Sequence, residues 1–285
     1  MNREIAIQTL IENARKISTN HQSIIESFYG IVKANIDDKE MFIPGYAPYI
    51  GEGYFEASTK IVIYALSQNL SPTDDISIEW AKNWQGGDSD NNSTNRQNIN
   101  FNNHGYVMMH PFDTGHLPVV AGILDYLVNP IAKRSQDIFK SISATNLSKF
   151  SFRDGNNTTD NPESLRKCFE WFSIREIKVL QPDYIICAGD DVYDVINAGF
   201  NDVVEQHPSI VKVAFPSLQV INSKYKNESI QNVNKIVQWI LTDFHELVLN
   251  RESSYKNRKT IREIIERDSN YFAAMYDSIK KQIYT

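Results

Sequence analysis

The stretch from Lys60 to Asn69 constrains the fold more than any other part of the chain. Its first half is a short apolar run rich in β-branched residues, which is typical of a strand covered on both faces, as in a parallel sheet. Its second half consists of short polar side chains, Ser67, Gln68 and Asn69. Because ligands bind just past the carboxyl ends of parallel strands, these three side chains are candidates for chemistry. The alternative interpretation is a solvated turn after the strand.

Three further segments have the same form, an apolar run that ends in polar or turn-forming residues. They are residues 141–147, which include Thr145-Asn146, residues 184–188, followed by Gly189-Asp190, and residues 211–215, followed by Pro216-Ser217. Helical patterns separate these runs, and such alternation predicts right-handed crossovers and a parallel sheet with helices on both faces. We therefore expect a three-layer α/β/α fold around a central four-stranded parallel sheet.

The chain has 285 residues, which is enough for one large domain. It shows no internal repeat and no convincing linker, so we expect residues 1–285 to form a single domain. Helical patterns over residues 1–40 and 228–285 predict extra helices at both ends. Residues 72–134 separate the first two predicted strands and are expected to be an insertion.

The composition of the chain indicates its cellular compartment and excludes some classes of partner. The sequence has no run of about 18 or more uncharged apolar residues, and its N-terminus does not match a secretory signal. Two cysteines, Cys168 and Cys187, cannot supply a disulfide framework or the four ligands of an iron–sulfur cluster. We therefore expect a cytoplasmic, monomeric protein without a membrane partner, an iron–sulfur cluster or another cofactor.

The net charge of −6 disfavours a nucleic-acid partner when it is considered alone. Binding to nucleic acid depends, however, on a local basic stripe rather than on the total charge. Residues 251–262 form a candidate stripe with one acid, Glu252, and five basic residues, Arg251, Lys256, Arg258, Lys259 and Arg262. The alternative interpretation of this stretch is the solvated start of a helix.

The order of the strand ends resembles the uracil-DNA glycosylase superfamily. In that family the first strand ends in a Gly-Gln-Asp-Pro or Gly-x-Asn-Pro motif that positions the attacking water. A later strand ends in an Asn that reads the base edge, and a strand near the C-terminus ends in His-Pro-Ser. The matching segments here are Leu66-Ser67-Gln68-Asn69-Leu70, Ala144-Thr145-Asn146-Leu147-Ser148-Lys149, Pro182-Asp183-Tyr184-Ile185-Ile186-Cys187-Ala188-Gly189 and Phe215-Pro216-Ser217. The resemblance covers residues 49–223 and implies a monofunctional DNA glycosylase.

The resemblance suggests catalytic and base-binding positions. Ser67 falls at the water-positioning place if the first motif is aligned without a gap, and Asn69 does so if the strand is two residues longer. Gln68 could also orient a water. Asn146 would read the base edge, because its amide offers both a donor pair and an acceptor. Its alternative role is to cap the strand end.

Other side chains are candidates for contacts with DNA. Aromatic rings can stack on an extruded base, and the candidates for this role are Tyr49, Tyr54, Phe112 and Phe215. Plain packing is the alternative for each ring. Candidates for contacts with the DNA backbone are Lys149, Ser217 and Lys224.

Two departures from the family pattern bear on the substrate. The first motif lacks its Gly and Pro, and Phe215 replaces the usual His, which in many members stabilises the departing base. A long insertion beside a pocket can also widen the site. These features favour a modified or bulky base over uracil, in DNA repair or in defence against phage. The alternative is a protein of the same fold that binds nucleic acid or a nucleotide without catalysis.

Three histidines, His104, His110 and His116, lie near Asp113 and suggest a metal-dependent hydrolase as another alternative. Their spacing does not match a pair on one helical face, and no second carboxylate cluster stands beside them. We therefore expect no metal site in this segment.

Overall fold

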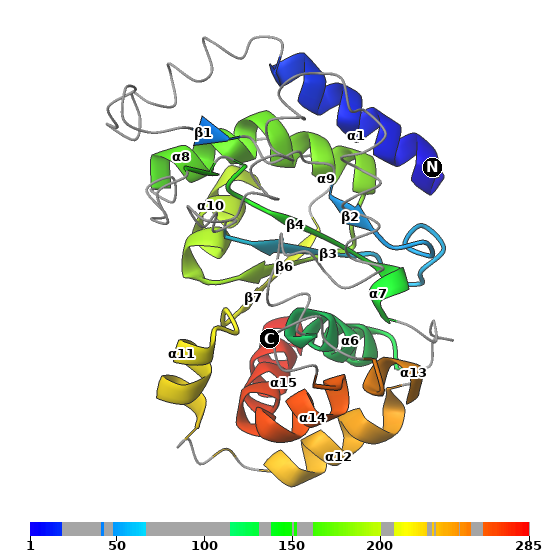
Figure 1. The fold of residues 1–285 in the computed structure, drawn as a ribbon, viewed down its shortest axis with the longest axis vertical. Coiled ribbons are helices and arrows are strands. Elements are labelled where there is room, and N and C mark those ends of the chain that lie inside the picture. Colours follow the sequence, from blue (N-terminus) through cyan, green and yellow to red (C-terminus); the bar gives the residue numbers. More distant parts are fainter. Residues whose placement is uncertain are drawn as a thin grey trace.

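The computed structural model shows a mixed α/β fold. The described residues are 1–18, 41–42, 48–66, 115–130, 138–149, 151–152, 162–200, 208–226, 230, 232–244, 246–251 and 259–284. Within them, a five-stranded sheet lies at the centre, with helices on both sides of it in Figure 1. Its strands, in spatial order, are β2 (Tyr49–Ile50), β4 (Ile142–Asn146), β3 (Ile61–Ala65), β6 (Tyr184–Ala188) and β7 (Ser209–Val213). A separate antiparallel pair joins β1 (Met41–Phe42) to β5 (Ser151–Phe152).

The four predicted strands are β3, β4, β6 and β7, and they are parallel to one another. The prediction of an α/β fold is therefore confirmed, but the sheet has five strands rather than four within the described chain. The extra strand, β2, has only two residues and pairs antiparallel with β4 at the edge of the sheet. β7 overlaps the predicted strand 211–215 but begins and ends two residues earlier. It ends ahead of Pro216, which has no N–H for a neighbouring strand.

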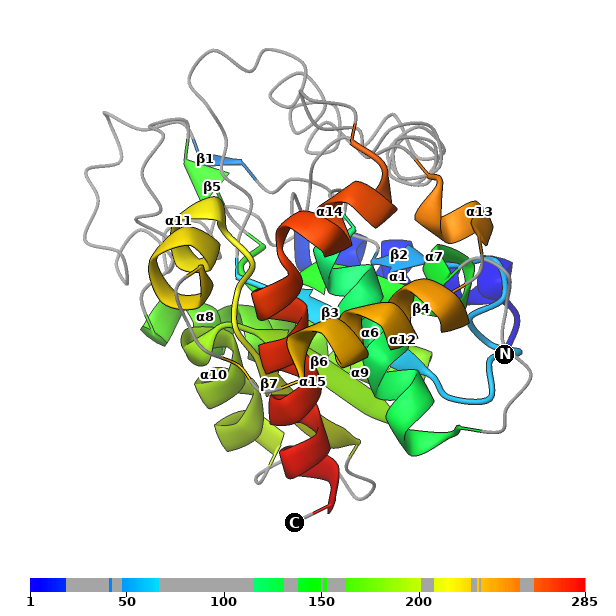
Figure 2. The same cartoon turned by 90° about the horizontal axis from the view of Figure 1, so that it is seen from below.

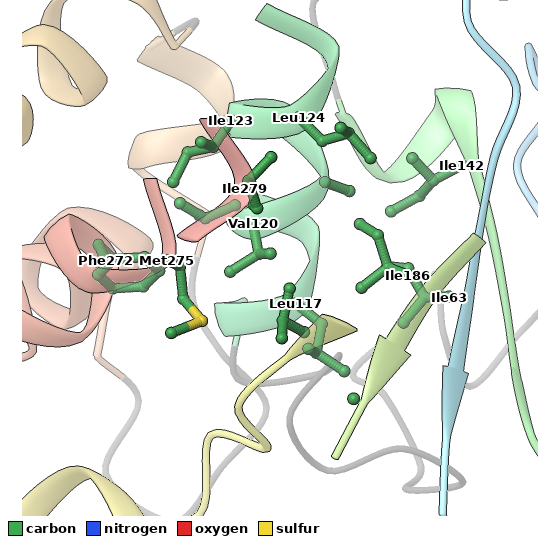
Figure 3. Close-up of a cluster of buried hydrophobic side chains, with 14 of the residues drawn as sticks. Ile63, Leu117, Val120, Ile123, Leu124, Ile142, Ile186, Phe272, Met275 and Ile279 are labelled. Carbon is green, nitrogen blue, oxygen red and sulfur yellow. The ribbon is translucent and has the colours of Figure 1, made fainter. Parts of the chain in front are cut away.

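Side chains alternate along each strand, and so the two faces of the sheet build two cores. Ile61 and Ile63 face a core formed with α6 (His116–Val128), α12 (Val233–Asp243) and α15 (Ser269–Tyr284). Val62 and Tyr64 face a core formed with α1 (Arg3–Ser18), α8 (Pro162–Cys168), α9 (Ile174–Leu180) and α10 (Asp190–Phe200). Figure 2 shows the first group of helices from below, and Figure 3 shows side chains of α6 between those of α15 and those of the sheet.

The helices differ in length and several are interrupted. On the first face lie α6 (His116–Val128), α7 (Ile138–Ser141), α12 (Val233–Asp243), α13 (Glu246–Leu249), α14 (Ile261–Arg267) and α15 (Ser269–Tyr284). On the second face lie α1 (Arg3–Ser18), α8 (Pro162–Cys168), the π-helix η2 (Phe169–Ser173), α9 (Ile174–Leu180) and α10 (Asp190–Phe200). After β7 come α11 (Leu218–Val220) and the π-helix η3 (Ile221–Tyr225).

The core includes helices from the expected insertion and from the expected extra C-terminal helices. α6 lies inside residues 72–134, the expected insertion, and residues 117–124 of this helix are buried. The C-terminal helices also pack against the sheet, and α15 buries Phe272 and Met275. These helices complete the first core, because the β-strands alone would leave their apolar face exposed.

We predict that Gly51 and Gly53 respond very differently to substitution by alanine. A Cβ at Gly51 would lie 2.3 Å from the Lys140 carbonyl oxygen, whereas a Cβ at Gly53 would lie 3.5 Å from the same atom. Neither glycine has a positive φ, so the difference is steric. Gly51→Ala is expected to lower the free energy of unfolding by about 2–3 kcal/mol, and Gly53→Ala by less than about 0.5 kcal/mol. Urea denaturation measures both, and equal losses would contradict this account of the β2 turn.

Candidate functional site

The carboxyl ends of β4, β3, β6 and β7 form one edge of the sheet, which we call the carboxyl edge. At this edge β3 and β4 stay side by side beyond their last strand residues. Ala65 and Asn146 are Cα partners, and the Leu147 N–H donates to the Ala65 carbonyl at 2.7 Å. The Ser148 N–H donates to the Leu66 carbonyl at 2.8 Å. Leu66 directly precedes Ser67, so the first motif begins beside the strand that carries Asn146.

Asn146 is almost completely buried, with 1% of its surface exposed. Its Cα partner Ala65 belongs to the core formed with α6, and paired residues of parallel strands point to the same face. Asn146 therefore lies on the α6 face at the carboxyl edge. A buried carboxamide can discriminate strongly between ligands that differ in their hydrogen-bonding groups. A ligand whose polar groups do not match the amide leaves a buried donor or acceptor without a partner, which weakens binding.

The ends of β6 and β7 add backbone turns and one aromatic ring. Gly189 has a φ of +114° and donates its N–H to the Val213 carbonyl at 2.9 Å. The half-buried Phe215 lies beside it, since a Cβ at Gly189 would be 4.0 Å from the Phe215 Cβ. Ser217 caps α11, and its Oγ accepts the Val220 N–H at 3.1 Å. Asn146, Phe215 and Ser217 thus share the carboxyl edge, as the sequence predicted.

Lys149 does not lie at the surface, and its expected contact with the DNA backbone is wrong for this structure. The side chain is 0% exposed, and its Nζ lies 2.8 Å from Glu176 Oε1. Nζ also donates to Thr145 Oγ1 at 2.6 Å. The Tyr64 hydroxyl donates to the second oxygen, Glu176 Oε2, at 2.8 Å. These four residues form a buried polar network on the α9 face of the sheet, opposite to Asn146.

The network holds ionisable groups away from water. Burial lowers the pKa of the Lys149 ammonium, and the neighbouring Glu176 carboxylate opposes that shift. Burial and the same carboxylate raise the pKa of Tyr64 well above its ordinary value, so the phenol stays neutral and donates. The network therefore has matched donors and acceptors, which a buried ion pair needs in order to persist.

Tyr49 and Tyr54 are packed inside the protein and are not available for stacking on a base. Tyr49 is 5% exposed, and its hydroxyl donates to the Phe139 carbonyl at 2.7 Å. Tyr54 is 0% exposed and donates to the Leu180 carbonyl at 3.2 Å. Leu180 precedes β6, so Tyr54 lies at the amino edge, opposite to Asn146. For both tyrosines the structure favours plain packing over base binding.

Several predicted positions lie outside the described residues. They are the catalytic candidates Ser67, Gln68 and Asn69, the stacking candidate Phe112, and His104, His110 and Asp113 of the histidine segment. Among the DNA-backbone candidates, Lys224 is exposed on η3, with its Nζ 5.5 Å from the centroid of the Tyr225 ring. Its contact with DNA stays a prediction.

Leu218, at the start of α11, is an exposed residue of the carboxyl edge that sequence reasoning did not single out. It directly follows Ser217 and is 51% exposed, so an apolar side chain faces solvent at the carboxyl edge. The signal in the sequence was an apolar side chain immediately after Phe215-Pro216-Ser217. Glu176 and Tyr64 were also missed, and no local pattern marks them, because they meet across 112 residues of sequence.

His116 supports the packing of α6. Its Nε2 lies 2.7 Å from Asp268 Oδ2, and its ring stacks on Phe272 with centroids 5.6 Å apart. Burial would raise the pKa of Asp268, but hydrogen bonds from Arg267 and His116 outweigh burial and hold that pKa below its ordinary value. No group of three or more potential ligand side chains that could hold a metal occurs in the described part of the chain.

A large cavity of about 900 Å³ lies at the opposite, amino edge. The described residues that line it include four carboxylates and one cation, namely Glu56, Asp125, Asp243, Glu246 and Arg262. The C-terminal ends of α6 and α12 also point there and add partial negative charge. Such a lining repels the phosphates of nucleic acid. The cavity is therefore a poor site for DNA despite its size.

Comparison of the chain with protein-family models, curated proteins and solved structures found no match. Among the described helices, none is long and apolar enough to cross a membrane. The side chains that the structure brings to the carboxyl edge include Asn146, Phe215, Ser217 and Leu218.

Proposed function

We propose that the protein is a DNA glycosylase that hydrolyses the N-glycosidic bond of a modified or bulky base. The observation that carries this proposal is the pairing of β3 with β4 at the carboxyl edge. It brings the buried amide of Asn146 next to the strand that leads into Ser67, Gln68 and Asn69. A base-reading amide and a water-orienting motif would then flank one sugar. A cytoplasmic, monomeric protein acting on DNA belongs to the same proposal.

The available groups favour water as the nucleophile. Amide and hydroxyl side chains cannot act as strong bases near neutral pH, but their oxygens can hold a water against the sugar carbon. Lys149, the lysine that follows Asn146 in the sequence, is buried in its pair with Glu176 and is not available as an amine nucleophile. Attack by water breaks the bond between C1′ and the base nitrogen and leaves an abasic site with the free base.

The leaving base must supply part of its own stabilisation. Phe215 offers an aromatic face rather than a hydrogen-bond donor at the end of β7. Without a donor there, negative charge on the departing base is less well stabilised. A base whose modification makes it a better leaving group would compensate, which supports a modified base over uracil.

The proposal is tested by incubating the protein with DNA duplexes that carry modified or unmodified bases and scoring abasic sites by strand scission in alkali. Abasic sites in at least one modified duplex are the expected result. Tight DNA binding without any abasic site would instead support the non-catalytic binder. A chelator added to an active reaction is expected to have no effect, and loss of activity would favour a metal-dependent hydrolase.

We expect Leu218 to act as a wedge beside the extruded nucleotide. Exposed apolar side chains of DNA-binding proteins insert between base steps and offset the cost of unstacking. Leu218→Ala is expected to lower kcat/KM for base release about tenfold. Ile5→Ala is the matched control, because Ile5 is similarly exposed at 56% but lies on α1. Equal effects of the two substitutions on kcat/KM would contradict the wedge.

A further inference from the structure

Lys149 and Thr145 enclose Asn146 in the sequence and are joined to each other in space. The Lys149 ammonium donates to the Thr145 hydroxyl at 2.6 Å, which closes the chain around Asn146, Leu147 and Ser148. Thr145 points to the α9 face, whereas Asn146 points to the α6 face. The network therefore holds the end of β4 in place from the α9 face of the sheet, which is opposite to the face that carries Asn146.

Side chains from α9, β3 and α8 hold the end of β4 through this network. Glu176 on α9 accepts Lys149 at 2.8 Å through one oxygen and Tyr64 of β3 at 2.8 Å through the other. The Lys149 backbone N–H also donates to the Cys168 sulfur at 3.5 Å, at the end of α8. The end of β4 is thus fixed to β3, α8 and α9 at once. Lys149 and Thr145, which lie within three residues of Asn146, make most of these contacts directly, and Tyr64 joins them through Glu176.

Stability alone is a weak reason to bury such charges. Removing two ions from water is expensive, and apolar side chains of similar size are often as stabilising as a buried ion pair. Buried polar groups do, however, enforce one arrangement, because any other leaves a charge or a hydroxyl unmatched. A side chain that must read a base edge by hydrogen bonds needs its strand held in one position.

We infer that Lys149, with Thr145 and Glu176, is a positioning residue that fixes Asn146 for base recognition. This inference rests on the proposed function for the role of Asn146. The immobilisation of the strand end itself can be tested without any activity. Lys149 never touches the base, and it acts by locking the backbone from Asn146 to Ser148.

The test compares Thr145→Val with Thr145→Ser. Valine keeps the shape and β-propensity of threonine but removes the hydroxyl that Lys149 binds, whereas serine retains that hydroxyl. In single-turnover assays on folded protein, Thr145→Val is expected to slow base release about tenfold, with unchanged affinity for DNA. Thr145→Ser is expected to release base at the wild-type rate. Wild-type rates in both variants would overturn the inference, even if Thr145→Val were less stable.

Hydrogen exchange supplies a readout that does not depend on catalysis. The amides of Leu147 and Ser148 donate to Ala65 and Leu66, so their exchange reports whether the end of β4 stays paired. Faster exchange at these two amides in Thr145→Val, but not in Thr145→Ser, is expected. If wild-type protein releases no base, the proposed function fails, while this exchange pattern still supports the lock. Unchanged exchange at both amides in Thr145→Val would overturn it.

Discussion

Asn146→Ala is expected to slow base release at least about 100-fold while the protein stays folded. The amide of Asn146 is buried at the end of β4. A base bound there would therefore form its hydrogen bonds with this amide instead of with water. Removing the amide leaves the polar edge of the bound base unmatched, and the loss is larger in a buried site than in water. Single-turnover kinetics with saturating protein measures this step without interference from product release.

The control for this substitution is Asn197→Ala. Asn197 is exposed on α10, outside the carboxyl edge, and so its replacement is expected to change the rate less than twofold. Thermal denaturation of both variants checks that they are folded at the assay temperature. A folded Asn146→Ala protein with the wild-type rate would remove Asn146 from the site.

Glu176→Ala is expected to lower the free energy of unfolding by about 3–5 kcal/mol, because it leaves the buried Lys149 charge without its partner. The matched control is Glu170→Ala, in the π-helix η2 that directly precedes α9. Glu170 also pairs with a lysine at 2.8 Å, but its side chain is 51% exposed. Its loss is expected to cost less than about 0.5 kcal/mol. Urea denaturation at neutral pH measures both values.

The double variant Glu176→Ala/Lys149→Met separates loss of the pair from loss of packing. Replacing both charges removes the unpaired ion, so the double variant is expected to be more stable than Glu176→Ala alone. A double variant that is less stable than Glu176→Ala would show that the buried charge is not the source of the loss.

The strands of this protein could be predicted because each is a short apolar run with turn residues at its end. The position of Asn146 followed from the same pattern, since parallel strands end at one edge. The two-residue strand β2 gives no such periodic signal. Tyr54 was assigned to the site, yet it precedes β3 closely in sequence. A residue just before a parallel strand lies at the amino edge, so this error could have been avoided.

Lys149 illustrates what sequence reasoning could not reach. A lysine four residues after Thr145, beyond the end of a strand, normally indicates a solvated loop. In the sequence, its partner Glu176 looks like an ordinary acidic residue on the surface of a helix. Only the packing of α9 on the sheet brings Lys149 and Glu176 together. Buried ion pairs between distant elements leave no local pattern, because each member alone matches the composition of the surface.

The most direct test of the central claim is the mass balance of the reaction. Free base and abasic sites are quantified together after wild-type protein or Asn146→Ala is incubated with DNA that carries a modified base. We predict equal amounts of free base and abasic sites with the wild type, and at least about 100-fold less of both with the variant at early times. No free base from any modified DNA, or equal release by both proteins, would contradict hydrolysis at the carboxyl edge.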